Sequence, residues 1–377
     1  MNKFKGFFSI GFADILGNGI TSFFWFYLAS LLSPEAYGEI HFFLGIAGVA
    51  AYSSLIGTQN TIIVYKAKNV KLQSTLYFIS LLIGIIASFT IIVLFYRIDV
   101  IFVLFGYIIN TLAIGDLLGR KAFGEYTKFV LIQKGLTLVL GLGFYYIFGV
   151  EGILYALAIT YIFYSKIIYK GLKDSKLDFN LLKTKIGFVA NNYSMILASG
   201  FYGQVDKLII APLLGFALLG NYSLALQATS AMMIISQIFF KYSLPQDSTG
   251  NNNPKLKKIT VLISIFIATL GIILAPILIP YFFPEYLDAI QAIQIMSLQV
   301  IPATIVLIYV SKLLGIEKTK IVLIARIISL IITIFGFIIL GPIYGILGLA
   351  VIVVVSSTVQ ASILIISSKK QVKYNEE

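Results

Sequence analysis

The sequence contains no cysteine, and this absence excludes disulfide bonds, thiol nucleophiles and thiolate metal sites. Histidine occurs once, at His41, and a single histidine cannot form a ligand cluster, which favours a bystander role over a ligand or proton relay. Charged residues make up only 12% of the 377 residues, whereas a soluble domain carries about 25%. These shortages exclude several kinds of catalytic site and indicate a chain that is not surrounded by water.

Long apolar runs take the place of charge. Hydrophobic residues make up 59% of the chain, and its mean hydropathy is +0.96. Runs of roughly twenty apolar residues, each long enough to cross a bilayer as a helix, recur about every thirty residues. Lipid cannot satisfy open backbone groups, so we expect every span to be helical. The pattern predicts twelve transmembrane helices: 7–32, 40–65, 74–96, 100–119, 128–148, 151–170, 186–211, 216–240, 259–283, 286–310, 320–340 and 343–366.

The basic residues are distributed unevenly among the breaks between spans. Of the 28 basic residues, all lie at one alternating set of span ends except Arg97, Lys134, Lys207 and Arg326. Because Lys and Arg collect on the cytoplasmic side, the pattern predicts a multi-pass protein of the cell (inner or plasma) membrane with both termini in the cytoplasm. This topology accounts for the net charge of +12, so we expect no nucleic-acid partner.

The two sides of the chain resemble each other. The polar break 171–185 separates six spans from six, which predicts two halves, 1–178 and 179–377. Leu31–Gly38 matches Leu213–Gly220 in character and in position after a first span, which indicates an internal duplication. Halves with an even number of spans enter the membrane from the same side, and parallel repeats of this kind build transporters around a central cavity.

Short motifs along nearly the whole chain carry a family resemblance. Their joint order resembles the Wzx-type oligosaccharide flippases of the multidrug/oligosaccharidyl-lipid/polysaccharide (MOP) exporter superfamily. The matching segments are Leu32–Gly38, Asp206–Ile210, Leu214–Tyr222, Phe283–Tyr286 and Gly315–Lys320.

The resemblance implies an all-α, MOP/MATE-like fold in which two six-helix halves surround a cavity lined by spans one, two, seven and eight. It implies translocation of a polyprenyl-diphosphate-linked oligosaccharide from the cytoplasmic to the outer leaflet by alternating access, for a cell-surface polysaccharide such as O-antigen or capsule. Membrane lipid and polysaccharide-assembly proteins are the further partners that it implies. The two extra C-terminal helices of the lipid II flippase branch are not expected here, which weighs against that branch.

Three other functions remain open. A drug/cation antiporter of the same superfamily would rely on inward-facing acids and aromatics more than on cations. A membrane polysaccharide polymerase or ligase would normally carry a large outer loop, whereas each predicted outer break is only a few residues long, so we do not expect an enzyme. A non-transporting assembly scaffold would not need a duplicated cavity. No nucleotide-binding motif occurs, and no cofactor or metal is expected.

Polar side chains inside the predicted spans mark candidate substrate contacts. Span one carries Asp14 and Asn18 at helical spacing, and spans two, seven and eight carry Gln59, Asn192 and Gln227. Small polar residues can also serve only to join helices, and that alternative stays open.

Two of the exceptional cations occupy matching positions. The offset of 192 residues that aligns Thr127–Lys128 with Thr319–Lys320 also aligns Lys134 with Arg326, roughly 9 Å from the cytoplasmic end of each fifth span. Arginine can grip a phosphate bidentately and lysine can neutralise it, so the pair is predicted to bind the diphosphate. The alternative is that both side chains reach out to the headgroups.

Three carboxylates are candidates for binding a coupling ion, either a proton or sodium: Asp14, Asp116 and Asp206. Each could instead pair with a cation. We expect Asp206 to point inward, with Lys207 pairing elsewhere or reaching the interface.

Overall fold

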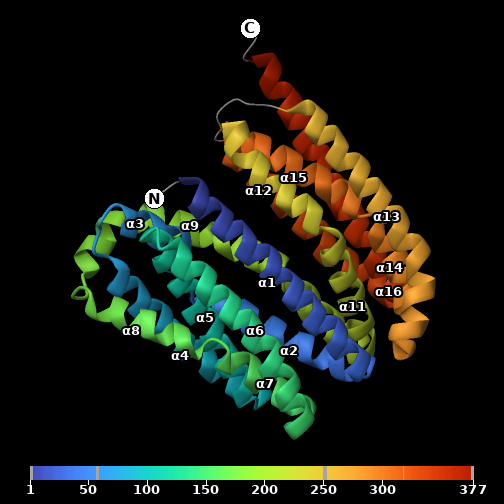
Figure 1. The fold of residues 1–377 in the computed structure, drawn as a ribbon, viewed down its shortest axis with the longest axis horizontal. Coiled ribbons are helices and arrows are strands. Elements are labelled where there is room, and N and C mark those ends of the chain that lie inside the picture. Colours follow the sequence, from blue (N-terminus) through green and yellow to red (C-terminus); the bar gives the residue numbers. More distant parts are fainter. Residues whose placement is uncertain (1–2, 57–58, 249–252, 317, 375–377) are drawn as a thin grey trace. The chain divides into compact units, whose positions relative to one another are not determined.

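The structure is a computed structural model of the chain and describes residues 3–56, 59–248, 253–316 and 318–374. Every element in these ranges is a helix (Figure 1). The helices group into two compact units. Unit 1 comprises Met1–Phe24 and Phe43–Val205, and unit 2 comprises Trp25–Phe42 and Asp206–Glu377. α1 and α2 therefore each contribute residues to both units. The predicted halves, 1–178 and 179–377, divide the chain by sequence repetition and remain a prediction.

Unit 1 is organised around α5, which packs against α3, α4, α6, α7 and α8. Glycines on α5 allow close approach: a Cβ atom on Gly115 would lie only 3.2 Å from the carbonyl oxygen of Gln59 on α3. Small residues commonly bring membrane helices together in this way. The helices of the first part of the chain are α1 (Lys3–Leu31), α2 (Pro34–Ser54), α3 (Gln59–Ala67), α4 (Gln73–Phe95), α5 (Ile98–Gly119), α6 (Phe123–Phe148), α7 (Val150–Ile159), η1 (Ile162–Tyr164), α8 (Ser165–Lys173) and α9 (Phe179–Tyr202).

Unit 2 is built around α14 and α15, which pack against α11, α12, α13 and α16. α16 contains one break, at Gly345, where a φ of 57° lies outside the helical region and suits glycine. The helices of this part are α10 (Val205–Leu214), α11 (Phe216–Met232), α12 (Ile234–Ser248), α13 (Pro254–Phe282), η2 (Pro284–Tyr286), α14 (Ala289–Ser297), α15 (Val300–Gly315) and α16 (Thr319–Tyr374).

The segments matched by the duplication contact each other inside unit 2. A Cβ atom on Gly38 would overlap the carbonyl oxygen of Phe216, and one on Gly220 would overlap the carbonyl oxygen of Pro34. Phe216 lies four residues before Gly220, and Pro34 lies four residues before Gly38, so the two contacts are equivalent. This reciprocal contact between α2 and α11 has the symmetry expected when a repeated segment packs against its own copy.

A motif before α14 secures the end of α1. Tyr286 is 1% exposed, and its hydroxyl donates a hydrogen bond of 2.9 Å to the backbone oxygen of Leu32. Its ring also meets that of Tyr37 edge to face, with centroids 6.0 Å apart. Two motifs that lie far apart in the sequence, Leu32–Gly38 and Phe283–Tyr286, are therefore neighbours in unit 2.

All twelve predicted spans fall on helical segments, several of them divided. Within the described residues, eight helical stretches are long and apolar enough to cross a membrane, or nine when the bent pair α11–α12 is taken as one span. Two predicted spans, 320–340 and 343–366, lie on the single element α16, and its break at Gly345 falls near the start of the second span. The chain is a multi-pass helical membrane protein, and the total of twelve crossings remains a prediction.

Candidate substrate and ion sites

Lys134 and Asp14, which the sequence analysis singled out separately, belong to one cluster in unit 1. The Lys134 side chain lies against α1: a Cβ atom on Gly17 would stand 3.2 Å from Lys134 Cγ. Asp14, almost one turn before Gly17, interacts electrostatically with Lys134. Its Oδ1 also accepts a hydrogen bond of 2.8 Å from the hydroxyl of Tyr126. We call Asp14, Tyr126 and Lys134 the α1–α6 cluster.

The local sequence accounts for the cluster. Gly17 has no side chain, so the aliphatic part of Lys134 can pass close to the α1 backbone. Tyr126, Val130 and Lys134 recur every fourth residue and therefore share one face of α6. The sequence analysis missed Tyr126, although this four-residue spacing from Lys134 was the signal that could have found it.

The α1–α6 cluster combines three chemical capacities in one place. An ammonium group can bind a phosphate, a carboxylate can take up a proton or a sodium ion, and a phenol can donate a hydrogen bond. Lys134 is half-buried, so its charge is only partly screened by solvent. An anion that reached Lys134 would compete with Asp14 for the same cation.

Asp116 lies elsewhere in unit 1, in a dense polar network. It is 4% exposed, and its Oδ1 accepts a hydrogen bond of 2.9 Å from Gln73 while its Oδ2 accepts one of 2.7 Å from Arg120. The Lys66 ammonium is 3.6 Å from Oδ1 and also bonds Gln73 and Asp174, at 2.6 and 2.7 Å. Both carboxylate oxygens of Asp116 are therefore engaged by protein groups, as in a structural ion-pair network.

The expectation that Lys207 would pair away from Asp206 was wrong. In unit 2, Lys207 Nζ lies 3.6 Å from Asp206 Oδ1, and both side chains are largely buried, with exposures of 14% and 11%. The helical angle of about 100° between neighbours does not keep them apart, because the long lysine side chain folds back to the shorter carboxylate. In a site withdrawn from water this pairing stabilises both charges.

His41 lies near this ion pair. Lys207 acts on it electrostatically, and the His41 ring packs against Trp25 and Tyr37, with centroid distances of 4.7 and 4.5 Å. Its Nε2 atom is buried and has no hydrogen-bond partner among the described residues. The packing is compatible with the expected bystander role.

The remaining predicted residues are dispersed. In unit 1, Asn18 is exposed on α1, the backbone of Gln59 contacts α5 at Gly115, and the Asn192 amide donates a hydrogen bond of 2.9 Å to the oxygen of Phe188 in its own helix. In unit 2, Gln227 on α11 and Arg326 on α16 are half-buried. Lys134 belongs to unit 1 and Arg326 to unit 2. Within unit 1, Asp14 and Lys134 are the two predicted residues that a described interaction joins directly.

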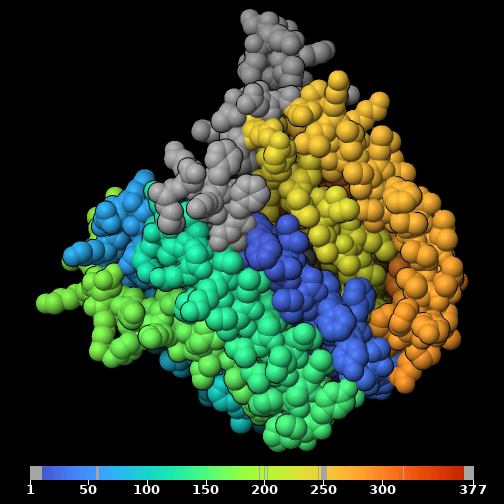
Figure 2. Space-filling view, in the orientation of Figure 1, coloured from blue at the N-terminus to red at the C-terminus, as the bar shows by residue number. Residues whose placement is uncertain are grey.

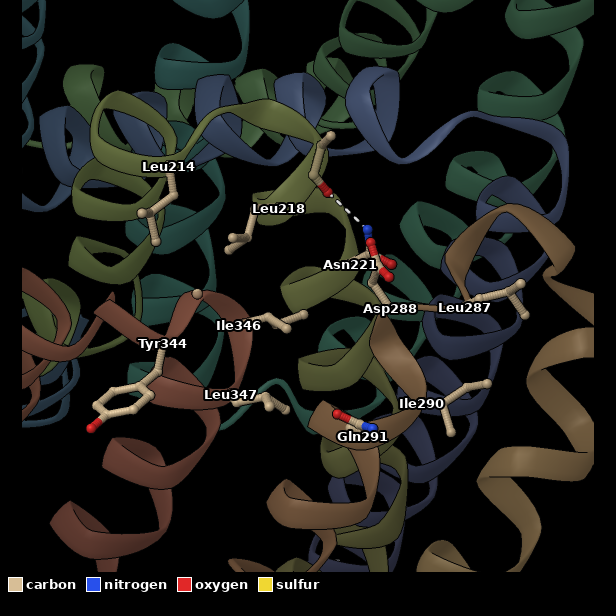
Figure 3. Close-up of a pocket in the computed structure, with 12 residues that line it drawn as sticks. Leu214, Leu218, Asn221, Leu287, Asp288, Ile290, Gln291, Tyr344, Ile346 and Leu347 are labelled. Atoms are coloured by element: carbon tan, nitrogen blue, oxygen red, sulfur yellow. Dashed lines mark hydrogen bonds between the residues drawn. The ribbon is translucent and has the colours of Figure 1, made fainter. Parts of the chain in front are cut away.

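A cavity of 690 Å³ in unit 2 was not anticipated. Figure 3 shows Asn221 of α11, Asp288 just before α14 and Gln291 of α14 on one side of it, with Tyr344 and Leu347 of α16 on the other. The Asn221 amide donates a hydrogen bond of 3.0 Å to the oxygen of Ala217. Its Oδ1 is buried without a partner among the described residues. None of the predicted site residues lines this cavity, although Asp288 and Gln291, three residues apart on one helical face, were a readable signal.

Titratable side chains that could hold a metal do not gather anywhere in the part of the chain that the structure describes. No group of three or more His, Asp or Glu residues has the required proximity there.

Comparisons with known proteins assign the fold. No known family profile and no curated protein sequence matches the chain. Among solved structures, an inward-facing multidrug resistance MATE family transporter of the MOP superfamily is similar with a TM-score of 0.71 and 16% identity, over 96% of this chain and 95% of that chain. The lipid II flippase MurJ, in an inward closed conformation, is similar with a TM-score of 0.73 and 15% identity, over 95% and 87% of the two chains.

A third similar structure is a MOP superfamily transporter from Pyrococcus furiosus, with a TM-score of 0.63 and 16% identity over 99% and 96% of the two chains. At these identities the likeness concerns the fold, and the chain has the fold of MOP superfamily transporters. The lipid II flippase, whose branch the sequence weighed against, is as similar in fold as the MATE transporters are.

Proposed function

We propose that this protein is a flippase that moves a polyprenyl-diphosphate-linked oligosaccharide from the cytoplasmic to the outer leaflet of the cell membrane, for the synthesis of a surface polysaccharide. Supporting this are the ordered motifs that resemble Wzx-type flippases and a fold shared with both drug transporters and a lipid II flippase. The observation that carries the proposal is Lys134, a cation within a predicted span that is held against Gly17 and opposed by Asp14.

In the proposed mechanism, Lys134 and Arg326 each contribute a positive charge to the diphosphate. Arginine can bind phosphate bidentately, whereas lysine acts as a point charge, so the two are complementary. Binding of the diphosphate displaces Asp14 from Lys134. The displaced carboxylate then takes up a proton or sodium ion, which links substrate binding to ion binding. The polar side chains of Asn18, Gln59, Asn192 and Gln227 contact the sugars, and the prenyl tail stays in lipid.

The membrane potential alone can favour this transport, so a coupled ion would assist it without being essential. An inside-negative membrane potential favours outward movement of an anionic headgroup by about 2.3 kcal/mol per charge per 100 mV. Of the three candidate carboxylates we propose Asp14 as the coupling residue, because it interacts with Lys134, the cation proposed to bind the diphosphate, whereas Asp116 and Asp206 interact with basic side chains outside that proposed site.

The decisive variant is Lys134→Ala combined with Arg326→Ala. We expect it to insert normally and to lose translocation of a fluorescent lipid-linked oligosaccharide in proteoliposomes, with the rate falling by at least tenfold. Two charge-assisted contacts to a phosphate supply more than the roughly 1.4 kcal/mol that a tenfold change requires.

The matched control is Lys128→Ala combined with Lys320→Ala. These two lysines are related by the same offset, are exposed, and lie six residues nearer the start of each predicted span. The control should flip at nearly the normal rate. Wild-type translocation by the Lys134/Arg326 variant would refute the proposed role of that pair.

A second candidate function is drug/cation antiport. The observation favouring it is the Asp14 carboxylate, hydrogen-bonded by Tyr126 in a fold shared with multidrug transporters. Under this alternative, Asp14→Asn abolishes efflux of a cationic drug from proteoliposomes, and the wild-type protein does not flip the lipid-linked oligosaccharide. Running both assays on the same preparations separates the two functions.

A further inference from the structure

A groove at the start of α13 is independent of the sites described above. It lies in unit 2, has a volume of 540 Å³ and is lined by residues of α13, α15 and α16. Three of its residues are lysines, Lys257, Lys258 and Lys312. The α13 groove, as we call it, thus combines several positive charges with walls supplied by membrane-spanning helices.

One of the three lysines already has a carboxylate partner. Lys257 Nζ lies 2.8 Å from Asp247 Oδ1, and the two side chains are 15% and 4% exposed. The other oxygen of Asp247 accepts hydrogen bonds from Ser311 at 2.6 Å and Ser243 at 3.2 Å. Asp247 is therefore fully engaged and has no oxygen left to neutralise a second lysine.

The other two lysines differ from Lys257 in their ion pairing. Within the described residues, no carboxylate forms an ion pair with Lys258 or Lys312, and no acidic residue lines the groove. Two ammonium groups at one mouth create a site of positive potential, which an anion would relieve. The charge of the α13 groove thus favours a negatively charged occupant.

The rest of the lining is apolar. Val261 and Leu262 of α13 face Ile305, Ile308 and Tyr309 of α15 across the groove. Ile305 and Tyr309 pack on a buried cluster that includes Val306, Val310 and Leu313. This wall suits a hydrocarbon chain better than a soluble anion, because its apolar side chains can pack closely against an acyl chain and offer an anion no hydrogen bond.

The position of the groove matches the start of the membrane span predicted from the sequence of α13. From Ile259 to Phe282, α13 contains no charged residue, whereas Lys255, Lys257 and Lys258 precede this run directly. Figure 2 shows α13, in orange, along an exposed face of unit 2, where Ile259, Leu262, Ile265 and Phe266 are exposed. The change from charged to apolar occurs inside the groove, as it does between the headgroup and the acyl chain of a phospholipid.

We propose that the α13 groove is a binding site for an anionic phospholipid. The lipid phosphate lies between Lys258 and Lys312, and one acyl chain lies along Val261, Ile308 and Tyr309. Basic pockets between transmembrane helices are known to recognise anionic headgroups in this manner. The site is distinct from the α1–α6 cluster, so it does not depend on what the protein transports.

The test uses the full-length protein in detergent and native mass spectrometry with added phosphatidylglycerol. Replacing both free lysines, Lys258→Gln with Lys312→Gln, should weaken phosphatidylglycerol binding on the order of tenfold or more, because each basic residue at such a surface contributes appreciably to binding. Binding of zwitterionic phosphatidylcholine should be weak and should not change. The variant Lys258→Arg with Lys312→Arg should restore binding, which excludes a loss caused only by misfolding.

The matched control is Lys255→Gln with Lys320→Gln. Both lysines are exposed, lie in the first turns of α13 and α16, and do not line the groove. This variant should therefore keep its affinity for phosphatidylglycerol within about twofold. An equal loss in the control would overturn the proposal in favour of general surface charge.

A second variant tests the apolar part of the site. Val261→Trp fills the groove and should reduce phosphatidylglycerol binding while leaving Lys258 and Lys312 in place. If Val261→Trp binds the lipid normally and inorganic phosphate competes fully with it, the groove is a soluble-anion site and the proposal fails.

Discussion

At the scale of single residues, the acidic side chains of this chain differ in the ion pairs and hydrogen bonds that the protein supplies to them. Asp116 is engaged on both oxygens, and Asp206 lies beside Lys207. Lys66 joins Asp116 to Asp174, which is 61% exposed on its side chain. The hydrogen bond from Lys66 and its charge hold the pKa of Asp174 below its ordinary value. The Lys66–Asp174 pair is therefore the solvent-exposed end of the polar network around Asp116.

Acid should weaken this exposed pair. A carboxyl whose pKa is lowered by folding stabilises the protein above its unfolded pKa of about 3.9, and that contribution is lost as pH falls through the folded value. Thermal unfolding in detergent should therefore show wild-type protein progressively losing its stability advantage over Asp174→Asn as pH falls below about 4, the ordinary pKa of an aspartate. We expect a difference below about 1 kcal/mol, since exposed pairs are screened.

The comparison needs a control acid. Glu151→Gln removes an exposed carboxylate with no ion pair among the described residues, and it should change the pH profile little. High salt should shrink the Asp174 effect. A constant difference between wild type and Asp174→Asn from pH 7 to pH 3 would contradict the role of the Lys66–Asp174 pair.

At the scale of helices, the most constrained contact is that of α2 with α11. Gly38 and Gly220 each face a backbone oxygen of the opposite segment, so the two helices are as close as their backbones allow. The contact joins the two segments that the sequence predicts to be copies of one motif, Leu31–Gly38 and Leu213–Gly220. Small residues have the same role in many membrane helix pairs, because packing replaces the hydrophobic effect inside a bilayer.

A single methyl group should disrupt this helix pair. Gly38→Ala places a Cβ atom on the Phe216 oxygen, and Gly220→Ala places one on the Pro34 oxygen. Neither backbone can move without shifting its helix, so we expect each variant to lose about 2 kcal/mol or more of stability, at the upper part of the range for overpacking. The measurement is the thermal unfolding midpoint in detergent.

Gly19→Ala is the matched control for that measurement. It makes the same chemical change within α1, where a Cβ atom meets nothing within 4 Å. Its stability should equal or exceed that of wild type, because alanine is the better helix former. Equal behaviour of Gly38→Ala and Gly19→Ala would mean that the α2–α11 contact is looser than described.

At the scale of the whole molecule, membrane topology is the property that the other proposals depend on. The basic residues predict cytoplasmic termini. In the part of the chain that the structure describes, eight or nine helical stretches satisfy the length and hydropathy requirements, which agrees with repeated membrane crossing. The direction of substrate movement and the leaflet that holds the α13 groove both follow from this orientation.

The absence of cysteine makes the orientation simple to measure. Glu285→Cys and Lys68→Cys place single thiols at exposed positions that are predicted to lie outside and inside the cell. A membrane-impermeant maleimide should label Glu285→Cys in intact cells and Lys68→Cys only after permeabilisation. The cysteine-free protein provides the unlabelled background, and the reverse pattern would overturn the topology.

Several features were accessible from sequence because they depend on local spacing. Hydropathy located the helices, since a span must be apolar along its length wherever it packs. Lys134 stood out as an uncommon cation in a span, and Asp14 as an uncommon acid. Tyr126 did not stand out, because a tyrosine is ordinary in a membrane helix until a partner is known. The Asp206–Lys207 pairing was predicted wrongly because helical angle was considered without side-chain length.

Composition and order alone determined that this chain is a helical membrane protein with repeated apolar spans, a basic bias on alternate ends and a duplicated motif. These properties are local or additive along the chain, so they do not require knowledge of which helices meet. Only the tertiary structure decided that Asp14 and Tyr126 accompany Lys134, that Gly38 and Gly220 pack reciprocally, and that Lys258 and Lys312 share a groove. Such contacts depend on side chains far apart in sequence, and the packing of whole helices selects them.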